Sequence, residues 1–468
     1  MSHPAPSLAR PPATARAEFA ALLRLAGPLV AANLLQMAVF AVDVVFVARL
    51  GPVAFAAATL GVFLFNLLTF AIIGLTGAAE PIIAAALGAR VGAVREVRRT
   101  FRAGLWLVVL AAVPVVALLL HGEALLLLFG QDAAVAARAG AFLAILALAV
   151  VPAAAAGLMR LTAAALGRPG YVFAVTVLAL GVAILANWCL VFGNAGFPAL
   201  GLEGAALASL VTSIAMMLAY AAILVTDRRL RRFHLFGRWW RSDRQHLRSV
   251  FRLGLPIALT WMFEGGLFGG AGLLMGLIGV AEVAAHAVAL NIAAVAFQLP
   301  FGIAQAATIR VGLAYGARDH AWIGRAGNVA LALGIGVMAL TAAVIWSVPA
   351  PLVGIYLDPS PANAPVAALA VRLLGIAAIF QLVDGAQAVA AGVLRGVQDT
   401  RVPMLVALFG YWAIGFGTAV WLGFGAGLGA TGIWWGLAAG LLVVSILLVR
   451  RWRHRERLGL ATRTARPK

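Results

Sequence analysis

The chain has 468 residues, of which 64% are hydrophobic and 11% are charged, and its formal net charge is +19. A soluble domain carries about 25% charged residues, so this composition excludes a soluble globular protein and indicates a chain embedded in a membrane. The single cysteine, Cys189, excludes a disulfide framework and a cysteine-based metal site.

Twelve apolar segments are each long enough to cross a bilayer, which takes about 20 residues in a helix. These segments are apolar on all sides instead of alternating with period two, which favours helices over the strands of an outer-membrane barrel. We therefore expect an all-α integral membrane protein with twelve transmembrane helices, over residues 22–48, 53–80, 102–120, 135–157, 169–193, 202–226, 253–278, 283–312, 326–348, 366–393, 402–423 and 430–450.

The positive charge follows the connections between these segments. Arginines gather in alternate connections: at 90–102, at Arg160 and Arg168, at 228–252, at 310–325, at Arg395 and Arg401, and after residue 450. This positive-inside pattern predicts a multi-pass protein of a bacterial-type inner membrane with both termini in the cytoplasm. It also accounts for the net charge without a nucleic-acid partner. The first twenty residues have no apolar core, so we expect a flexible cytoplasmic tail there and not a signal peptide.

The two halves of the sequence begin alike. "LRLAGPLVAANLLQ" from Leu23 and "FRLGLPIALTWMFE" from Phe251 are 228 residues apart, and the same offset aligns the "GAR" triplets at 88–90 and 316–318. Internal repeats of this kind are common in transporters. We expect two pseudo-symmetric six-helix lobes related by an axis along the membrane normal, with a cavity between them. The predicted domains are a tail 1–20, an N-lobe 21–226, a basic linker 227–250, a C-lobe 251–452 and a basic tail 453–468.

Three acidic residues lie well inside the predicted spans, namely Asp43, Glu264 and Asp384, while Glu80 lies nearer the inner end of its span. No lysine is available to neutralise them, because Lys468 is the only one in the chain. Intramembrane acids are functional sites by default, since a charge inside a bilayer is costly. The alternative is a protonated acid that hydrogen-bonds to a neighbouring helix.

Other polar residues recur at helical spacing within four spans. Each amide could simply join two helices, but four such stripes facing one interior favour a wetted path or cavity. Aromatic residues beside the acids, Trp261, Phe263 and Phe380, could stack on a flat cationic ligand or serve only in packing. The stripes are Asn33, Gln36 and Asp43; Asn66, Thr69, Thr76 and Glu80; Asn291, Gln298 and Gln305; and Gln381, Asp384 and Gln387.

Some chemistries are excluded. A Walker A loop needs a lysine beneath the phosphates, and none exists before Lys468. His286 is the only histidine inside a predicted span, so no histidine-rich metal centre or intramembrane His/Asp catalytic pair is visible. We expect no cofactor, no structural metal and no enzymatic activity.

Three stretches carry a family resemblance: "VDVVFVARLG" from Val42, "AAHAVALNIAAVAFQLPFGIAQAATIRVG" from Ala284 and "VDGAQAVAAGVLRGVQDTRVPM" from Val383. With the two six-span lobes, they resemble the multidrug and toxic compound extrusion (MATE) family, specifically its NorM-type branch, over residues 20 to 450. The resemblance implies export of organic, often cationic and aromatic compounds in exchange for inward Na⁺ or H⁺.

The resemblance also assigns roles to individual residues. Asp43 matches the span 1 acid of the family's N-lobe cation site, which could hold Na⁺, and Asn187 and Ser209 match its companions on spans 5 and 6. Glu264 and Asp384 match the C-lobe acids that bind cation and substrate. The remaining expected substrate contacts are Gln36, Asn291, Gln298, Trp261 and Phe380.

Two positions depart from the family's pattern. Ala183 stands where an asparagine is frequent, and Phe380 stands where some Na⁺-coupled members have a tyrosine. Both changes remove ligands that Na⁺ would use, so H⁺ is the preferred coupling ion.

The sequence thus predicts a monomeric secondary transporter that exports small organic cations by antiport and alternating access. Glu264 would remain in its helix because it is exchanged between a cation or proton and the substrate. The alternatives are a lipid-linked oligosaccharide flippase of the same superfamily, an intramembrane enzyme and a cation channel.

Overall fold

The computed structural model describes residues 11–240 and 243–461, and these residues form helices and turns without any β-strand. Within them, 12 helices are long and apolar enough to cross a membrane, which confirms the predicted all-α class and number of spans. Parts of the predicted tails 1–20 and 453–468 and of the linker 227–250 lie outside the described residues, at 1–10, 462–468 and 241–242.

Ten of the described spans are single helices, and two are made of consecutive pieces. The single helices are Ala15–Ala48 (α1), Ala93–Leu120 (α4), Ala133–Ala165 (α6), Pro169–Phe192 (α7), Gly201–Thr226 (α8), Arg244–Ile278 (α9), Val280–Ala317 (α10), His320–Ser347 (α11), Ala364–Gly396 (α13) and Gly429–Arg453 (α16). Pro52–Gly77 (α2) continues into Ala79–Ala89 (α3), and Arg401–Leu408 (α14) continues through Phe409–Phe416 (η4) and Gly417–Val420 (α15) to Trp421–Gly425 (η5). Gly122–Leu128 (α5) and Pro349–Gly354 (α12) are short.

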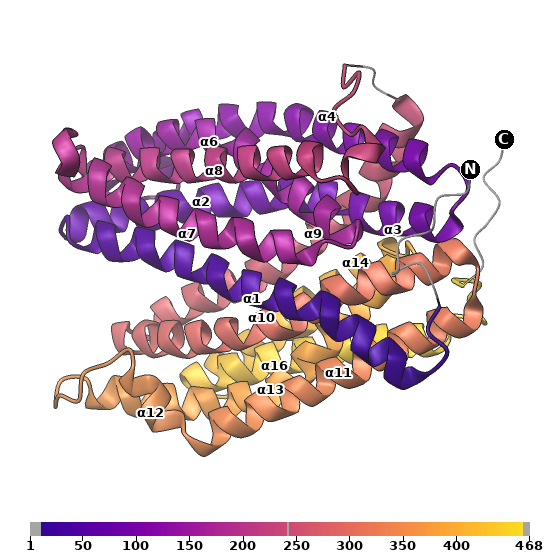
Figure 1. The fold of residues 1–468 in the computed structure, drawn as a ribbon. Helices are drawn as coiled ribbons and strands as arrows, with labels where there is room; N and C mark the ends of the chain where they lie inside the picture. The colour runs from indigo at the N-terminus through magenta and orange to yellow at the C-terminus, as the bar shows by residue number, and fades with distance from the viewer. Residues whose placement is uncertain (1–10, 241–242, 462–468) are drawn as a thin grey trace. The chain divides into compact units, whose positions relative to one another are not determined.

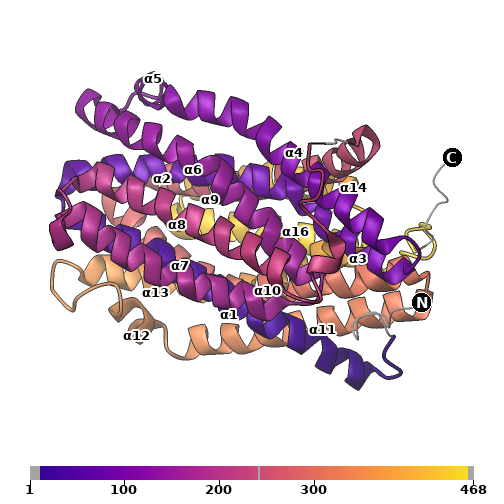
Figure 2. The same cartoon turned by 45° about the horizontal axis from the view of Figure 1, so that its top comes forward.

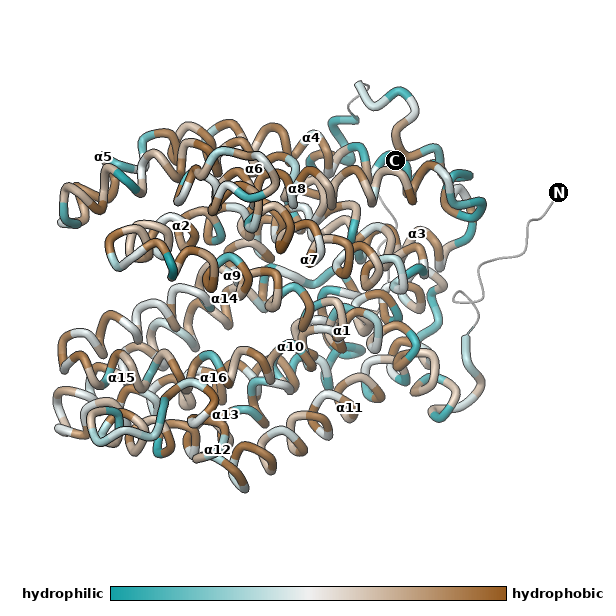
Figure 3. Tube along the Cα trace, turned by 60° about the vertical axis from the view of Figure 1, so that its left-hand side comes forward, coloured by the Kyte–Doolittle hydropathy of each residue, from teal (hydrophilic) through white to brown (hydrophobic). Residues whose placement is uncertain are grey.

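Apolar residues run along the helices and polar residues gather at the connections (Figure 3). Several helices extend beyond the apolar stretch that predicted them. Helix α4 begins at Ala93 instead of residue 102, because its first turns carry arginines, which are good helix formers although they are polar. Helix α1 begins at Ala15, inside the segment 1–20 that the sequence suggested to be a flexible tail.

The chain divides into two compact units. The unit called here the N-unit contains Ala31–Ala86 and the described residues of Arg90–Ala258. In it, α6 packs on α2, α4 and α8, and α7 packs on α8 (Figure 1). The short α5 forms the turn between α4 and α6 and packs on α6 (Figure 2).

The second unit, called here the C-unit, contains Leu87–Ala89 and the described residues of Met1–Val30 and Leu259–Lys468. Helix α13 packs on α10, α11 and α16, and α16 also packs along η4, α15 and η5. The short α12 connects α11 to α13 (Figure 2). The division into lobes at 227–250 stays a prediction, because α1 and α9 each contribute to both units.

The change of unit in α1 and α9 falls just after a proline. Helix α1 passes from the C-unit to the N-unit after Val30, two residues beyond Pro28, and α9 passes from the N-unit to the C-unit after Ala258, two residues beyond Pro256. In both helices, the segment before the change of unit lies close to another helix at a glycine. A Cβ on Gly254 would lie 1.7 Å from the Leu75 carbonyl oxygen, and one on Gly302 would lie 2.8 Å from the Val30 nitrogen.

A buried ion pair fixes the beginning of α1 within the C-unit. Arg310 of α10 donates from Nε and Nη2 to the two carboxylate oxygens of Glu18, each at 2.7 Å. The indole nitrogen of Trp322 donates to Glu18 at 3.0 Å, and the guanidinium lies over the Trp322 ring. All three side chains are at most 1% exposed. Arg310, which the sequence placed among the basic connections, is therefore an internal partner of Glu18.

Candidate functional site

The N-unit brings together the three residues predicted to form its cation site. Asp43 lies on α1, and Asn187 and Ser209 lie on α7 and α8. The Asn187 amide nitrogen donates to Asp43 Oδ1 at 2.7 Å, and the Ser209 hydroxyl donates to Asp43 Oδ2 at 3.2 Å. Each carboxylate oxygen thus accepts a hydrogen bond from a different helix.

Small residues allow these helices to approach one another, as is usual between membrane helices. Ala183 and Ala179 lie one and two turns before Asn187 on the buried face of α7, and both pack against Val39 of α1. The carbonyl of Ala183 accepts a second hydrogen bond from the Asn187 amide, at 2.9 Å. Ala183, at the position where the family frequently has an asparagine, therefore contacts Asn187 through its backbone carbonyl.

One oxygen of this trio is available to a ligand. Asn187 is fully buried, and its Oδ1 atom has no hydrogen-bond partner among the described residues. Together with the Asp43 carboxylate and the Ser209 hydroxyl it supplies oxygen atoms, which are the ligands that hard cations prefer. The trio can therefore accept a proton on Asp43 or coordinate a small cation.

A second polar contact in the N-unit was not predicted. Arg160 of α6 donates from Nη2 to Oδ1 of Asn33, which is 4% exposed. The sequence had assigned Arg160 to a basic connection, whereas the structure places it within α6, between buried Met159 and Leu161. Asn33 of the predicted α1 stripe therefore has an arginine partner on α6. Gln36 of the same stripe is half-buried.

The C-unit brings together the two predicted acids, Glu264 on α9 and Asp384 on α13, which act electrostatically on each other. Asp384 is 5% exposed, and its Oδ1 atom has no hydrogen-bond partner among the described residues. Two carboxylates in apolar surroundings repel each other when both are charged, and a proton or a cation relieves that repulsion. The pair can therefore exchange one such positive charge for another.

Two polar residues of α13 complete the surroundings of Glu264. The side chain of Gln387 lies within hydrogen-bonding reach of the Glu264 carboxylate, and Arg395 attracts that carboxylate. Gln387 belongs to the predicted stripe with Gln381 and Asp384, and all three are buried. Arg395, which the sequence places in a basic connection, therefore also acts on an acid of this site.

Tyr411 is a member of this site that the sequence did not indicate. It lies in the π-helical segment η4, is fully buried and acts electrostatically on both Glu264 and Asp384. Its hydroxyl has no hydrogen-bond partner among the described residues. A phenol hydroxyl can both donate and accept, so Tyr411 can follow the carboxylates as they gain or lose a proton.

The predicted aromatic contacts lie in two groups within the C-unit. Phe380 is buried, and its ring lies 5.6 Å from that of Trp434, whose indole nitrogen donates to His286 Nδ1 at 3.1 Å. Trp261 is half-buried, and its ring centroid lies 6.1 Å from that of Phe301. The described contacts of these rings are with other aromatic side chains.

The residues of the α10 stripe differ in their exposure. Asn291 is exposed and donates to the Ala287 carbonyl of its own helix. Gln298 is half-buried and donates in the same way to Ala294, whereas Gln305 is 7% exposed. Glu80, to which no role was assigned, is buried in α3.

Comparison with known protein families gives one match. The MatE family model matches residues 28–189 and 256–421, which are segments of the two halves of the sequence repeat.

Comparison with individual proteins agrees with that match. The chain is 45% identical over 445 residues to a probable multidrug resistance protein NorM of Mesorhizobium japonicum, covering 95% of each chain. It is 44% identical over 437 residues to a protein of the same name from Brucella suis, covering 93% of each. Among solved structures, the crystal structure of the eukaryotic MATE transporter AtDTX14 superposes with a TM-score of 0.85 at 23% identity, over 95% of this chain and 97% of that one.

Proposed function

Because the chain belongs to the MatE family of transporters and is not an enzyme, we propose that it is a multidrug efflux transporter that exports organic cations by antiport with H⁺. The observation that carries this proposal is the electrostatic interaction between the two acids Glu264 and Asp384 of the C-unit. Carboxylates held in apolar surroundings attract cations and repel anions. The absence of lysine before Lys468 is consistent with the same substrate class.

Coupling follows from competition for the same charges. A cationic substrate and a proton each neutralise a carboxylate of the pair, so the binding of one weakens the binding of the other. Gln387 and Tyr411 can adjust their hydrogen bonds to either occupant, since an amide and a phenol both donate and accept. Alternating access would then release the substrate on one side and the proton on the other.

We assign Asp43, Asn187 and Ser209 to a second cation site. H⁺ is preferred over Na⁺ as the coupling ion for a reason that lies in the sequence. Phe380 and Ala183 lack the side-chain oxygens that Na⁺ would use.

An ion-gradient experiment tests this function. Everted membrane vesicles that contain the protein should accumulate a fluorescent cationic dye from the medium when the vesicle interior is more acidic than the medium. An imposed Na⁺ gradient without a pH gradient should have no effect. Dye uptake driven by Na⁺ alone, and lost in Asp43→Asn, would identify the N-unit trio as a Na⁺ site and contradict H⁺ coupling.

We also propose that the protein lies in a bacterial-type inner membrane as a monomer, with both termini in the cytoplasm. Arginines crowd the connection that contains Trp240, between α8 and α9, which the positive-inside rule places in the cytoplasm. A reporter enzyme active only in the periplasm should therefore be inactive when fused after Trp240 and active when fused in the Gly193–Leu200 connection. The opposite result would reverse the topology.

A further inference from the structure

A cavity of the N-unit lies where α4 begins and the connection between α8 and α9 passes. It has a volume of about 700 Å³, and among its described lining residues six are arginines and one is acidic. The lining residues are Arg95, Arg98, Arg99, Arg102, Gly237, Arg238, Asp243 and Arg244. This set is called here the arginine pocket.

The helical repeat of α4 explains how the arginines come together. Residues 95, 98, 99 and 102 follow the spacing i, i+3, i+4 and i+7, which places them on one face of a helix. Arg98, Arg99 and Arg238 all act electrostatically on Arg102. The Nη2 atom of Arg102 lies 3.8 Å from the position that a Cβ on Gly237 would take, so the guanidinium lies beside the connection between α8 and α9.

The acids nearby do not neutralise this charge. Burial alone would raise the pKa of Asp243, but His246 and hydrogen bonds from the backbone of His246 and Gln245 hold it below its ordinary value. The ionised carboxylate pairs with Arg99 at 3.5 Å and with His246 at 2.9 Å. His246 also contacts Glu96 at 3.0 Å. The pocket therefore keeps an excess of five positive charges, counted from its six arginines and one aspartate.

The arginines are also incompletely hydrogen-bonded. The Nε atoms of Arg98 and Arg102 are buried and have no partner among the described residues. A guanidinium offers donors in a planar fork that matches the oxygens of a phosphate group. Like charges held together with spare donors indicate a site that is completed by an anion.

Tryptophans border the pocket at the polar end of an apolar helix. One turn beyond Arg102 on the same face, Trp106 donates to the backbone carbonyl of Trp239, and their rings lie 6.1 Å apart. Trp239 and Trp240 are 54% and 62% exposed. Exposed tryptophans beside the polar end of an apolar helix are typical of the headgroup level of a bilayer.

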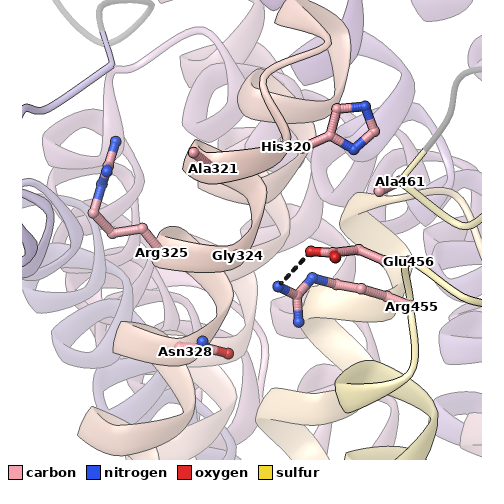
Figure 4. Close-up of a pocket in the computed structure, with 8 residues that line it drawn as sticks. All are labelled: His320, Ala321, Gly324, Arg325, Asn328, Arg455, Glu456 and Ala461. Carbon is pink, nitrogen blue, oxygen red and sulfur yellow. Dashed lines mark hydrogen bonds and ion pairs between the residues drawn. The ribbon is translucent and has the colours of Figure 1, made fainter.

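The equivalent cavity of the C-unit provides an internal comparison. The repeat offset places residues 95–102 on 323–330, at the start of α11. A cavity of about 500 Å³ lies there, lined by His320, Ala321, Gly324, Arg325, Asn328, Arg455, Glu456 and Ala461. Arg455 pairs with Glu456 at 3.4 Å, and Arg325 extends away from that pair (Figure 4). The large excess of charge is therefore a feature of the arginine pocket and not of the repeat.

We propose that the arginine pocket binds a phosphate group, supplied by the headgroup of an anionic phospholipid in the cytoplasmic leaflet. Basic pockets at this level of membrane proteins suit such headgroups, and the position beside Trp106 and Trp239 favours a lipid over a free phosphate ion. Bound lipid would neutralise the repulsion among the arginines and join α4 to the connection before α9.

The test is lipid titration of the purified full-length protein in a neutral detergent, with retained lipid counted by native mass spectrometry and unfolding followed on heating. Phosphatidylglycerol should bind and raise the unfolding temperature of the wild type, whereas phosphatidylcholine should not. In Arg98→Gln/Arg102→Gln the affinity for phosphatidylglycerol should fall roughly thirtyfold, which is about fivefold for each arginine removed. The matched control Arg450→Gln/Arg453→Gln removes the same charge from exposed positions at the end of α16 and should bind as the wild type does.

A second double variant tests the proposal if the first one fails to fold. Arg95→Gln/Arg244→Gln changes two exposed lining residues and should also weaken binding of phosphatidylglycerol. Equal loss in the α16 control would show diffuse attraction to the lipid surface and overturn the site. Stabilisation by inorganic phosphate, but not by phosphatidylglycerol, would overturn the lipid as its source.

Discussion

Vesicles that contain Glu264→Gln are expected to show no dye uptake driven by a pH gradient, at protein levels equal to those of the wild type. The amide keeps the size and hydrogen-bonding capacity of the side chain but cannot take up a proton or attract a cation. Since losing one partner of a buried charge pair costs about 2–5 kcal/mol, dye binding itself should weaken roughly thirtyfold or more. The measurement is the initial rate of dye accumulation, normalised to the amount of protein.

Asp384→Asn should have the same effect, because Glu264 and Asp384 act on each other and on Tyr411. Asn66→Ala on α2 is the matched polar control, and it should keep most of the wild-type rate, since Asn66 is a half-buried amide of the N-unit and carries no charge to exchange. Wild-type transport by Glu264→Gln would refute the proposed exchange at the acid pair.

The pH dependence of dye binding separates charge competition from a structural role of Glu264. In the wild type, acidification adds protons to the carboxylates and removes negative charge, so the affinity for a cationic dye should fall as the pH falls. Glu264→Gln should retain only the weaker pH dependence that Asp384 provides. Tyr411→Phe removes a buried hydroxyl and leaves the ring. It should alter the pH dependence of dye binding, while the amount of folded protein stays close to that of the wild type.

The fold was accessible from sequence because its signals are local and repeated. Twelve apolar stretches, alternate arginine-rich connections and the 228-residue repeat each predict the same architecture, and the family match is consistent with it. The trio of Asp43, Asn187 and Ser209 was also predicted, and the structure places these side chains within hydrogen-bonding distance. Its role in ion binding stays a proposal.

The residues that were missed depend on contacts between distant parts of the chain. Tyr411 looks like any aromatic residue of an apolar span, and only the packing of the π-helical segment η4 places it near the acids. Arg160 and Arg310 were interpreted as topology signals, because an arginine near a span end usually lies in the headgroup region. The structure gives them internal partners, Asn33 and Glu18.

Glu18→Gln is expected to destabilise the protein more than any single change at the acidic sites. It would leave the guanidinium of Arg310 buried without its counter-charge, since both side chains are at most 1% exposed. Breaking a buried ion pair by removing one partner costs about 3–5 kcal/mol. The amount of monodisperse protein that survives heating in detergent, measured by size-exclusion chromatography, should fall strongly. Glu203→Gln, at an exposed acid in the first turn of α8, is the control and should behave as the wild type does.

The double variant Glu18→Met/Arg310→Met distinguishes an uncompensated charge from lost packing. Replacing a buried ion pair by apolar residues of similar volume is often neutral, so the double variant should be more heat-resistant than Glu18→Gln alone. Only the double variant removes the acceptor of the Trp322 indole nitrogen, because the amide oxygen in Glu18→Gln can still accept that hydrogen bond, and this difference works against the double variant. If the double variant is the less stable of the two, then the contacts of the two long side chains, and not the charge of Arg310, hold the start of α1 in the C-unit.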